Sequence, residues 1–262
     1  MLEAFRRHWP HYIAEAAGLA FFMANASLIT TLLRSPLSPF AGAIKQPFLQ
    51  LVALGLWMGC VIAIVVYSPW GKKSGAHINP AVTLAFWRLG KIKAPDAFFY
   101  ILFQFAGGAL MVQVMGLILG KSYSHPAIKH VATVPGVGGP LKAFVAEGVI
   151  SFILMLVLLL AINSKKLEKW AGAIAGLLIC LYLMFEEPYS GMSLNPARSF
   201  ASALAAREWT GLWIYFTSPV LAMILAAEAF RAMTRGRNHL PNVPKAEESA
   251  AEPAPQLQGA ST

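Results

Sequence analysis

Long apolar runs separated by short polar segments make up most of the chain. A helix needs about 20 apolar residues to cross the roughly 30 Å hydrocarbon core of a bilayer. Six runs approach or exceed that length, and the fifth of them is the shortest. They are residues 12–33, 48–68, 97–119, 141–162, 170–185 and 211–233. The pattern therefore predicts an all-α membrane protein with six transmembrane helices.

Two shorter apolar segments each begin with the tripeptide Asn-Pro-Ala. Proline has a helical φ and lacks only an N–H that the first turn leaves unpaired, so each proline predicts a first helical residue and each asparagine an N-cap. The runs that follow, 81–89 and 197–206, are about 15 Å long as helices, half of a span. The tripeptides are Asn79, Pro80, Ala81 and Asn195, Pro196, Ala197. Irregular backbone at membrane depth needs protein or a water-filled cavity to satisfy it, so two such half-helices indicate a polar pathway between them.

The two halves of the chain repeat one another in inverted orientation. Glu15 in the first apolar run and Glu147 in the fourth have similar neighbours, Ile-Ala-Glu-Ala-Ala-Gly and Val-Ala-Glu-Gly-Val-Ile. Each half therefore has a glutamate-bearing span, a second span, a half-helix and a third span. Because three crossings per half is an odd number, the second copy enters from the opposite face. We expect inverted repeats at about 12–119 and 141–233 within one membrane domain, residues 12–233.

The composition excludes a soluble domain. It gives no sign of a nucleic-acid interface, a metal site or an enzyme active site. Apolar residues make up 57% of the chain and charged residues 13%, with a mean hydropathy of +0.58. The net charge of +9 lies between apolar runs rather than in a patch, so no nucleic-acid partner is indicated. Cys60 and Cys180 lie inside apolar runs without metal-ligand spacing, which predicts packing residues rather than a metal site or a disulfide. No nucleophile–base set appears, so we expect neither an enzyme nor a cofactor.

The distribution of Lys and Arg predicts that both termini are cytoplasmic. Residues 1–11 then form a basic cytoplasmic N-terminus, and residues 234–262, rich in Pro, Ala, Glu and Ser, a disordered cytoplasmic tail. The first run is long enough to span, so no cleavable signal peptide is expected. In this orientation thirteen basic residues lie inside and five lie in or beside the outer loops, as the positive-inside rule requires. The five are Arg34, Lys45, Lys121, Lys129 and Lys142.

The two Asn-Pro-Ala segments resemble those of the major intrinsic protein family, the aquaporins and aquaglyceroporins. Residues 74–83, Ser-Gly-Ala-His-Ile-Asn-Pro-Ala-Val-Thr, and 195–200, Asn-Pro-Ala-Arg-Ser-Phe, match both family signatures. Gln104 and the pair Gly107-Gly108 also fall where the family has them, as do the two glutamates. The resemblance covers roughly residues 12–233. It implies a right-handed bundle that assembles as a homotetramer in a plasma or bacterial inner membrane, with one passive pore per protomer for water or small neutral solutes.

The half-helices explain how such a pore could exclude ions. Two helix N-termini that meet at the midplane present about half an elementary charge each to the same point, which repels cations and protons. The amide donors of Asn79 and Asn195 can bind a water oxygen and turn both of its hydrogens away, which interrupts a chain of proton hopping. The alternative is that each asparagine only caps its helix.

An outer constriction is expected around Arg198, a permanent cation at membrane depth. The resemblance places it where it donates to permeants and repels cations, and the alternative is a structural arginine tied to loop carbonyls. Leu183, Met192 and Gly59, with Met58 adjacent, fall at the other filter positions, so the constriction looks apolar. Leu183 stands where water-selective members have His, which favours glycerol. Ser199, Ala203, Tyr215 and Phe216 match water channels instead, so the two indicators conflict.

The remaining intramembrane polar residues have structural and functional interpretations. Glu15 and Glu147 are expected to accept hydrogen bonds from the re-entrant loops, rather than to relay protons, and the resemblance gives Gln104 a structural role too. His77 is expected to pack within its loop, with a pH sensor as the alternative. Glu186 and Glu187 stand near the outer mouth, where one of them either pairs with Arg198 or lines the vestibule, or both are solvated.

The leading functional hypothesis is a passive channel for water, with small neutral solutes such as glycerol as a second class of permeant. A glycerol facilitator is the first alternative. A secondary transporter also uses inverted repeats and broken helices, but it needs a closed site with coupling-ion ligands. A non-conducting membrane protein would leave the Asn and Arg residues of the expected pore without a role.

Overall fold

The computed structural model describes residues 1–234, and the predicted tail lies outside this part except for Thr234. Within it the chain is helical and contains no strand. Six helices are long and apolar enough to cross a membrane. They are α1 (Leu2–Arg34), α2 (Pro47–Tyr67), α5 (Ala94–Ser124), α6 (Gly139–Ile162), the helical segment Glu168–Phe185 that contains α7 (Ala171–Phe185), and α10 (Leu212–Thr234). The predicted spans are confirmed, with ends that differ by a few residues except at the first helix.

The first helix begins well before residue 12, where the apolar run starts. It begins at Leu2, so most of the expected N-terminal segment is helical. The extension packs against α5, where the His8 Nδ1 atom lies 2.8 Å from Asp96 Oδ1 and the Tyr12 hydroxyl donates to the same oxygen at 2.6 Å. The Phe5 ring also packs on Phe99 of α5. The length of the apolar run could not indicate this extension, because contacts with the distant helix α5 hold it.

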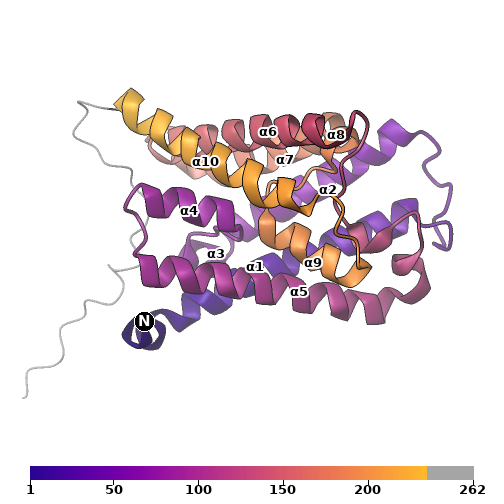
Figure 1. Ribbon diagram of the computed structural model, residues 1–262, viewed down its shortest axis with the longest axis horizontal. Helices are drawn as coiled ribbons and strands as arrows, with labels where there is room; N and C mark the ends of the chain where they lie inside the picture. Colours follow the sequence, from indigo (N-terminus) through magenta and orange to yellow (C-terminus); the bar gives the residue numbers. More distant parts are fainter. Residues whose placement is uncertain (235–262) are drawn as a thin grey trace, which may run out of the picture.

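Two half-length helices, α4 (Pro80–Arg88) and α9 (Pro196–Ala206), lie in the middle of the bundle. Figure 1 shows them much shorter than the helices around them, with the one-turn helices α3 (Pro69–Ser74) and α8 (Glu187–Ser190) toward opposite ends of the molecule. The 3-10 turns η1 (Lys129–Val131) and η2 (Glu168–Trp170) complete the elements of residues 1–234. This arrangement is the predicted inverted repeat, with one half-helix entering from each face.

Helices from corresponding places in the two halves pack in corresponding ways. In the first half α1 packs along α5, and in the second α6 packs along α10; α2 and α7 join the halves. The re-entrant helices cross over, because α4 packs on α10 and α9 packs on α5. Both ends of the described chain lie at the same end of the bundle, where the start of α1 and the end of α10 are seen on the left of Figure 1.

The contact between α2 and α7 depends on glycine. A Cβ on Gly59 would lie 2.5 Å from the Gly176 carbonyl oxygen, and a Cβ on Gly176 would lie 2.3 Å from the Gly59 carbonyl oxygen. The two backbones therefore touch at this point. The expectation that both cysteines are packed is half wrong, because Cys180 is buried beside this contact whereas Cys60 is exposed on the outside of α2.

Candidate functional site: two facing re-entrant loops

The first re-entrant loop is held by the carboxylate of Glu15, which is fully buried. Its Oε1 atom accepts from the Ser74 hydroxyl at 2.7 Å and the His77 N–H at 3.0 Å. Its Oε2 atom accepts from the Ile78 N–H at 2.5 Å and the Gln104 amide at 2.7 Å. The loop has no helical or strand partner for these N–H groups, so the carboxylate supplies the acceptors that lipid cannot.

Glu147 holds the second loop in the same way. Its Oε1 atom accepts from the Ser190 hydroxyl at 2.7 Å and the Ser193 N–H at 2.6 Å, and its Oε2 atom from the Leu194 N–H at 2.7 Å. The third helix of each half adds a tyrosine, because Tyr100 donates to the Ser74 carbonyl and Tyr215 to the Ser190 carbonyl. These contacts use the glutamates as acceptors of backbone hydrogen bonds, the arrangement expected for a structural role.

Each loop crosses the left-handed region of backbone space just before its asparagine. In the first loop Ala76 has φ +50° and Ile78 +41°; in the second Met192 has +48° and Leu194 +60°. Such conformations are costly for residues with a side chain and persist only where surrounding contacts fix them. Here the carboxylate bonds to the loop N–H groups fix them, and the carbonyls of Ile78 and Leu194 are turned toward the other loop.

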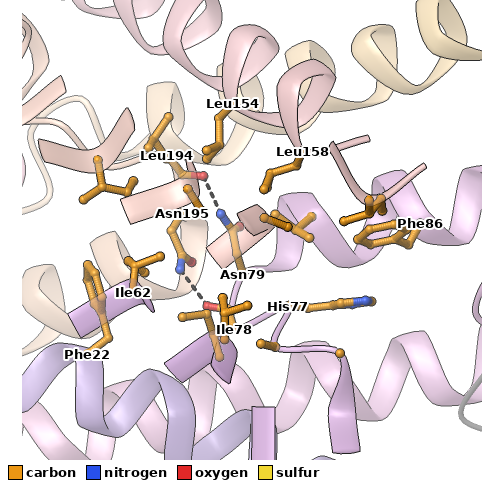
Figure 2. A pocket seen from close by; sticks show the side chains of 18 of the residues that line it. Phe22, Ile62, His77, Ile78, Asn79, Phe86, Leu154, Leu158, Leu194 and Asn195 are labelled. Carbon is orange, nitrogen blue, oxygen red and sulfur yellow. Dashed lines mark hydrogen bonds between the residues drawn. The ribbon is translucent and has the colours of Figure 1, made fainter. Parts of the chain in front are cut away.

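Asn79 and Asn195 form a reciprocal pair at the centre of the molecule. Each Oδ1 atom caps its own helix, Asn79 accepting from the Ala81 N–H at 2.8 Å and Asn195 from the Ala197 N–H at 3.0 Å. Each side-chain amide then donates across to the opposite loop at 2.8 Å, to the carbonyls of Leu194 and Ile78 (Figure 2). Since an amide NH2 has two hydrogens, one N–H of each asparagine remains without a partner in residues 1–234. Both asparagines therefore cap, and both keep a donor for another ligand.

A cavity of about 170 Å³ adjoins this pair. Both asparagines line it, together with the loop residues 75–78 and 192–194, and most of the rest of its wall is apolar, including the Ile62, Leu154 and Leu158 side chains seen in Figure 2. The loop backbone and the two amides therefore supply polar groups along one side of an otherwise apolar cavity.

A second cavity, of about 50 Å³, contains Arg198. Phe22, Ile179 and Met192 line both cavities, so the two cavities adjoin one another. Arg198 is 7% exposed, and its Nη1 atom donates to the Val131 carbonyl at 3.2 Å. Arg198 is thus bound to a loop carbonyl and also lines the cavity, so the two expected interpretations of this residue are compatible.

The wall of the second cavity corrects one predicted position. Leu183 and Met192 line it with Arg198, as expected, but Gly59 does not, because it lies in the backbone contact with Gly176. The cavity residues from α2 are Leu54 and Met58, which lie on one face of the helix. Counting back from Asn79 therefore gave a residue of α2 that lies outside the wall of this cavity. Two longer apolar side chains line the wall instead.

Other residues singled out in the sequence hold the loops from behind. The His77 ring lines the first cavity and stacks on Phe86 with ring centroids 4.7 Å apart, while its Nδ1 atom lies 3.2 Å from the Thr83 hydroxyl. Gln104 bonds to both Glu15 and Thr83. Ser199 bonds to Ser193 and Thr133 through their hydroxyls, so it positions the second loop rather than facing the cavities.

Sequence reasoning missed two groups at the second cavity, the Val131 carbonyl and Arg34. The three residues of η1 all have positive φ, +45°, +54° and +57°, which turns the Val131 carbonyl toward Arg198. No local motif marks that turn. Arg34 ends an apolar run and therefore looked like a loop cation, but it lines the cavity and pairs with Glu187. Within the described residues no group of three His, Cys, Asp or Glu side chains could hold a metal ion.

Comparison with known proteins identifies the family. The family model described as major intrinsic protein matches residues 5–230. Aquaporin AqpM of Methanothermobacter thermautotrophicus is 32% identical over 85% of this chain and 96% of its own length. Aquaporin NIP1-2 of Arabidopsis thaliana is 34% identical over 68% of this chain, and the match spans 61% of that relative. The aquaglyceroporin from Plasmodium falciparum shares the fold, with a TM-score of 0.70 and 17% identity over 85% of this chain and 95% of that one. The chain belongs to the major intrinsic protein family and is an integral membrane protein.

Proposed function

We propose that the chain conducts water as its main permeant, with low permeability to glycerol or a solute of similar size, and that it excludes ions and protons. The observation that carries the proposal is the crossed pair of Asn79 and Asn195. The two half-helices present their N-termini to one point, and each asparagine keeps one free amide hydrogen there. A water oxygen that accepts from these donors has both hydrogens turned away, so a proton cannot hop through it.

The outer cavity supports the second part of the proposal. Arg198 supplies a permanent donor, and Met58, Leu183 and Met192 supply apolar surface around it. Carbon-bound hydrogens of a small polyol can rest against such a wall while its hydroxyls meet the guanidinium. The cavity volume of about 50 Å³ is much smaller than the about 170 Å³ of the inner cavity, so solutes larger than water should pass slowly at this point.

Placement in the membrane follows from the arrangement of charges and ends. We propose that both ends of the described chain face the cytoplasm of a plasma or bacterial inner membrane, because the basic residues concentrate in the loops on that side. We propose a homotetramer with one pore per protomer. The names of the relatives, which are aquaporins and an aquaglyceroporin, agree with water and small neutral solutes as permeants but do not choose between them.

The test is light scattering by proteoliposomes after an osmotic step. Wild-type vesicles should shrink faster than protein-free vesicles in sucrose, and in glycerol they should shrink and then slowly reswell. Vesicles with a pH-sensitive dye inside should hold a proton gradient. Arg198→Val should raise glycerol flux and proton leak, because it neutralises and widens the outer cavity. Wild-type vesicles that never reswell in glycerol would restrict the function to water, and water flux equal to that of empty vesicles would refute the proposal.

A further inference from the structure

Arg34 and Glu187 form an ion pair between two distant parts of the chain. Arg34 is the last residue of α1 and Glu187 the first residue of α8, just before the second re-entrant loop. The Arg34 Nη1 atom lies 2.5 Å from Glu187 Oε1, and the two side chains are 25% and 24% exposed. A short, largely buried contact of this kind is a charge-assisted hydrogen bond rather than a loose surface pair.

Both partners line the same cavity as Arg198. On α1 the lining residues are spaced by four: Phe22, Ala26, Thr30 and Arg34. Residues at this spacing share one face of a helix, and twelve residues extend about 18 Å along its axis. Phe22 also lines the inner cavity beside the asparagines, so Arg34 lies at the outer end of the pathway. The ion pair therefore stands beyond Arg198, where a solute would first enter.

The Glu187 carboxylate neutralises one of the two arginines that line this cavity. The charged groups that line it are Arg34, Glu187 and Arg198. With Glu187 bonded to Arg34, the three carry a net charge of one positive, so Arg198 retains its donors for a permeant. Loss of Glu187 would leave two positive charges in a small, poorly hydrated space, and loss of Arg34 would leave the carboxylate free to approach Arg198.

We propose that the Arg34–Glu187 ion pair is a second constriction at the outer mouth, which limits the size of the solutes that reach Arg198. The inference rests on the proposed function, because it takes the two cavities as the conducting pore. The two partners come from α1 and from α8, so their side chains bridge between these elements at the entrance. A water molecule can pass beside such a bridge, whereas a polyol requires it to swing aside. The pair thus sets the ratio of solute flux to water flux.

The experiment compares glycerol and erythritol permeability with water permeability in proteoliposomes. Arg34→Gln and Glu187→Gln should each raise the ratio of polyol to water permeability several-fold, and erythritol should gain more than glycerol because it is larger. The exchange Arg34→Glu with Glu187→Arg should bring the ratio back toward the wild-type value. Arg7→Gln serves as the control, because Arg7 forms an exposed pair with Glu3 at the opposite end of α1.

The outcomes separate this inference from the proposed function. Single variants with ratios within twofold of a conducting wild type would overturn the role of the pair and leave the channel function intact. Raised ratios that the charge exchange fails to restore would show that side-chain size, not pairing, matters, and would overturn it as well. Wild-type vesicles that conduct no water would overturn both. Each single variant breaks the pair from a different side, so the inference is still tested if one of them does not fold.

Discussion

The side-chain amide of Asn79 donates a 2.8 Å hydrogen bond to the main-chain carbonyl of Leu194, in the other half of the chain. Serine at position 79 can still cap α4 but cannot reach across, so Asn79→Ser separates the two roles. Loss of the crossing bond should cost on the order of 1 kcal/mol of stability. Water permeability per channel should fall because a donor at the midplane is lost. Proteoliposome swelling measures this; unchanged permeability would mean that the amide serves the fold alone.

Removal of the Glu147 carboxylate should prevent stable folding. In Glu147→Ala the N–H groups of Ser193 and Leu194 lose their acceptor away from water, at a cost of about 1–3 kcal/mol each. We expect a sharp loss of monodisperse protein on size exclusion in detergent. Glu147→Gln keeps one acceptor oxygen and should be affected less, and Glu168→Gln, on the exposed η2 turn, should behave like the wild type. Normal yield and melting temperature for the alanine variant would contradict the loop-holding role.

Alanine at Gly59 should destabilise the protein without changing its selectivity. The new Cβ would meet the Gly176 carbonyl oxygen at 2.5 Å and force α2 and α7 apart, which costs about 1–3 kcal/mol. Gly116→Ala is the matched control, because a Cβ there meets no atom within 4 Å and alanine favours a helix by up to about 1 kcal/mol. Melting temperatures in detergent should move in opposite directions. A changed ratio of glycerol to water flux in a fully stable Gly59→Ala protein would show that Gly59 lines the pore after all.

Histidine at Leu183 should make the channel more selective for water. Leu183 lines the cavity that contains Arg198, and a polar ring would remove the apolar surface on which a polyol rests. Glycerol flux should fall more than water flux, as measured by reswelling in a glycerol gradient. Leu183→Met, which keeps volume and apolarity, should retain the wild-type ratio. Equal losses of both fluxes in the histidine variant would indicate simple blockage.

Glu186 should make stability depend on pH. It is 7% exposed, and neither carboxylate oxygen has a hydrogen-bond partner in the described residues. Burial, with the charge of Glu147 nearby, raises its pKa from 4.5 to about 8. Below about pH 4.5 both folded and unfolded states are protonated. Between that value and about pH 8 the unfolded state ionises first, so stability falls as pH rises, by about 1.4 kcal/mol per unit.

The Glu186→Gln variant isolates this dependence. Glutamine cannot ionise, so its melting temperature relative to the wild type should rise between pH 5 and pH 8 and then level off. Glu187→Gln should not reproduce the trend, because the Glu187 carboxylate is already paired with Arg34. A difference between Glu186→Gln and wild type that stays constant from pH 5 to pH 8 would show that Glu186 is ionised throughout.

The sequence predicted most of the fold because the fold depends on periodic and duplicated features. Apolar runs located all six spans, and proline after asparagine located the start of both half-helices. What it could not predict depends on contacts between distant residues. The helical extension before Tyr12 packs on α5, where Asp96 binds His8 and Phe99 contacts Phe5. Leu54 and Met58, rather than Gly59, line the outer cavity, because Gly59 lies where α2 touches α7.

Charged residues at the outer mouth were the hardest to place. A loop cation and a cation in the pore entrance have the same local sequence, so Arg34 could not be distinguished from Lys45. One of Glu186 and Glu187 was expected to pair with Arg198 or to line the vestibule, with a solvated helix end as the alternative. Glu187 lines the outer cavity, and its partner is Arg34. Such pairings depend on how the end of α1 packs against the second re-entrant loop. The pattern of apolar residues in the sequence gives no information about that contact.

The crossed amide bonds also constrain the order in which the newly made chain can mature. Glu15 precedes the Ile78 N–H by 63 residues, so the first loop can be fastened while the second half is still being synthesised. Asn79, however, lies 115 residues before Leu194, and Ile78 lies 117 residues before Asn195. The N-terminal part of a chain emerges first. The Asn79 amide therefore has no Leu194 carbonyl to donate to until the second half has been made. The crossed bonds therefore form only after the second half-helix has been made, and a protein arrested after its third span would expose the Asn79 amide to lipid or to the insertion machinery.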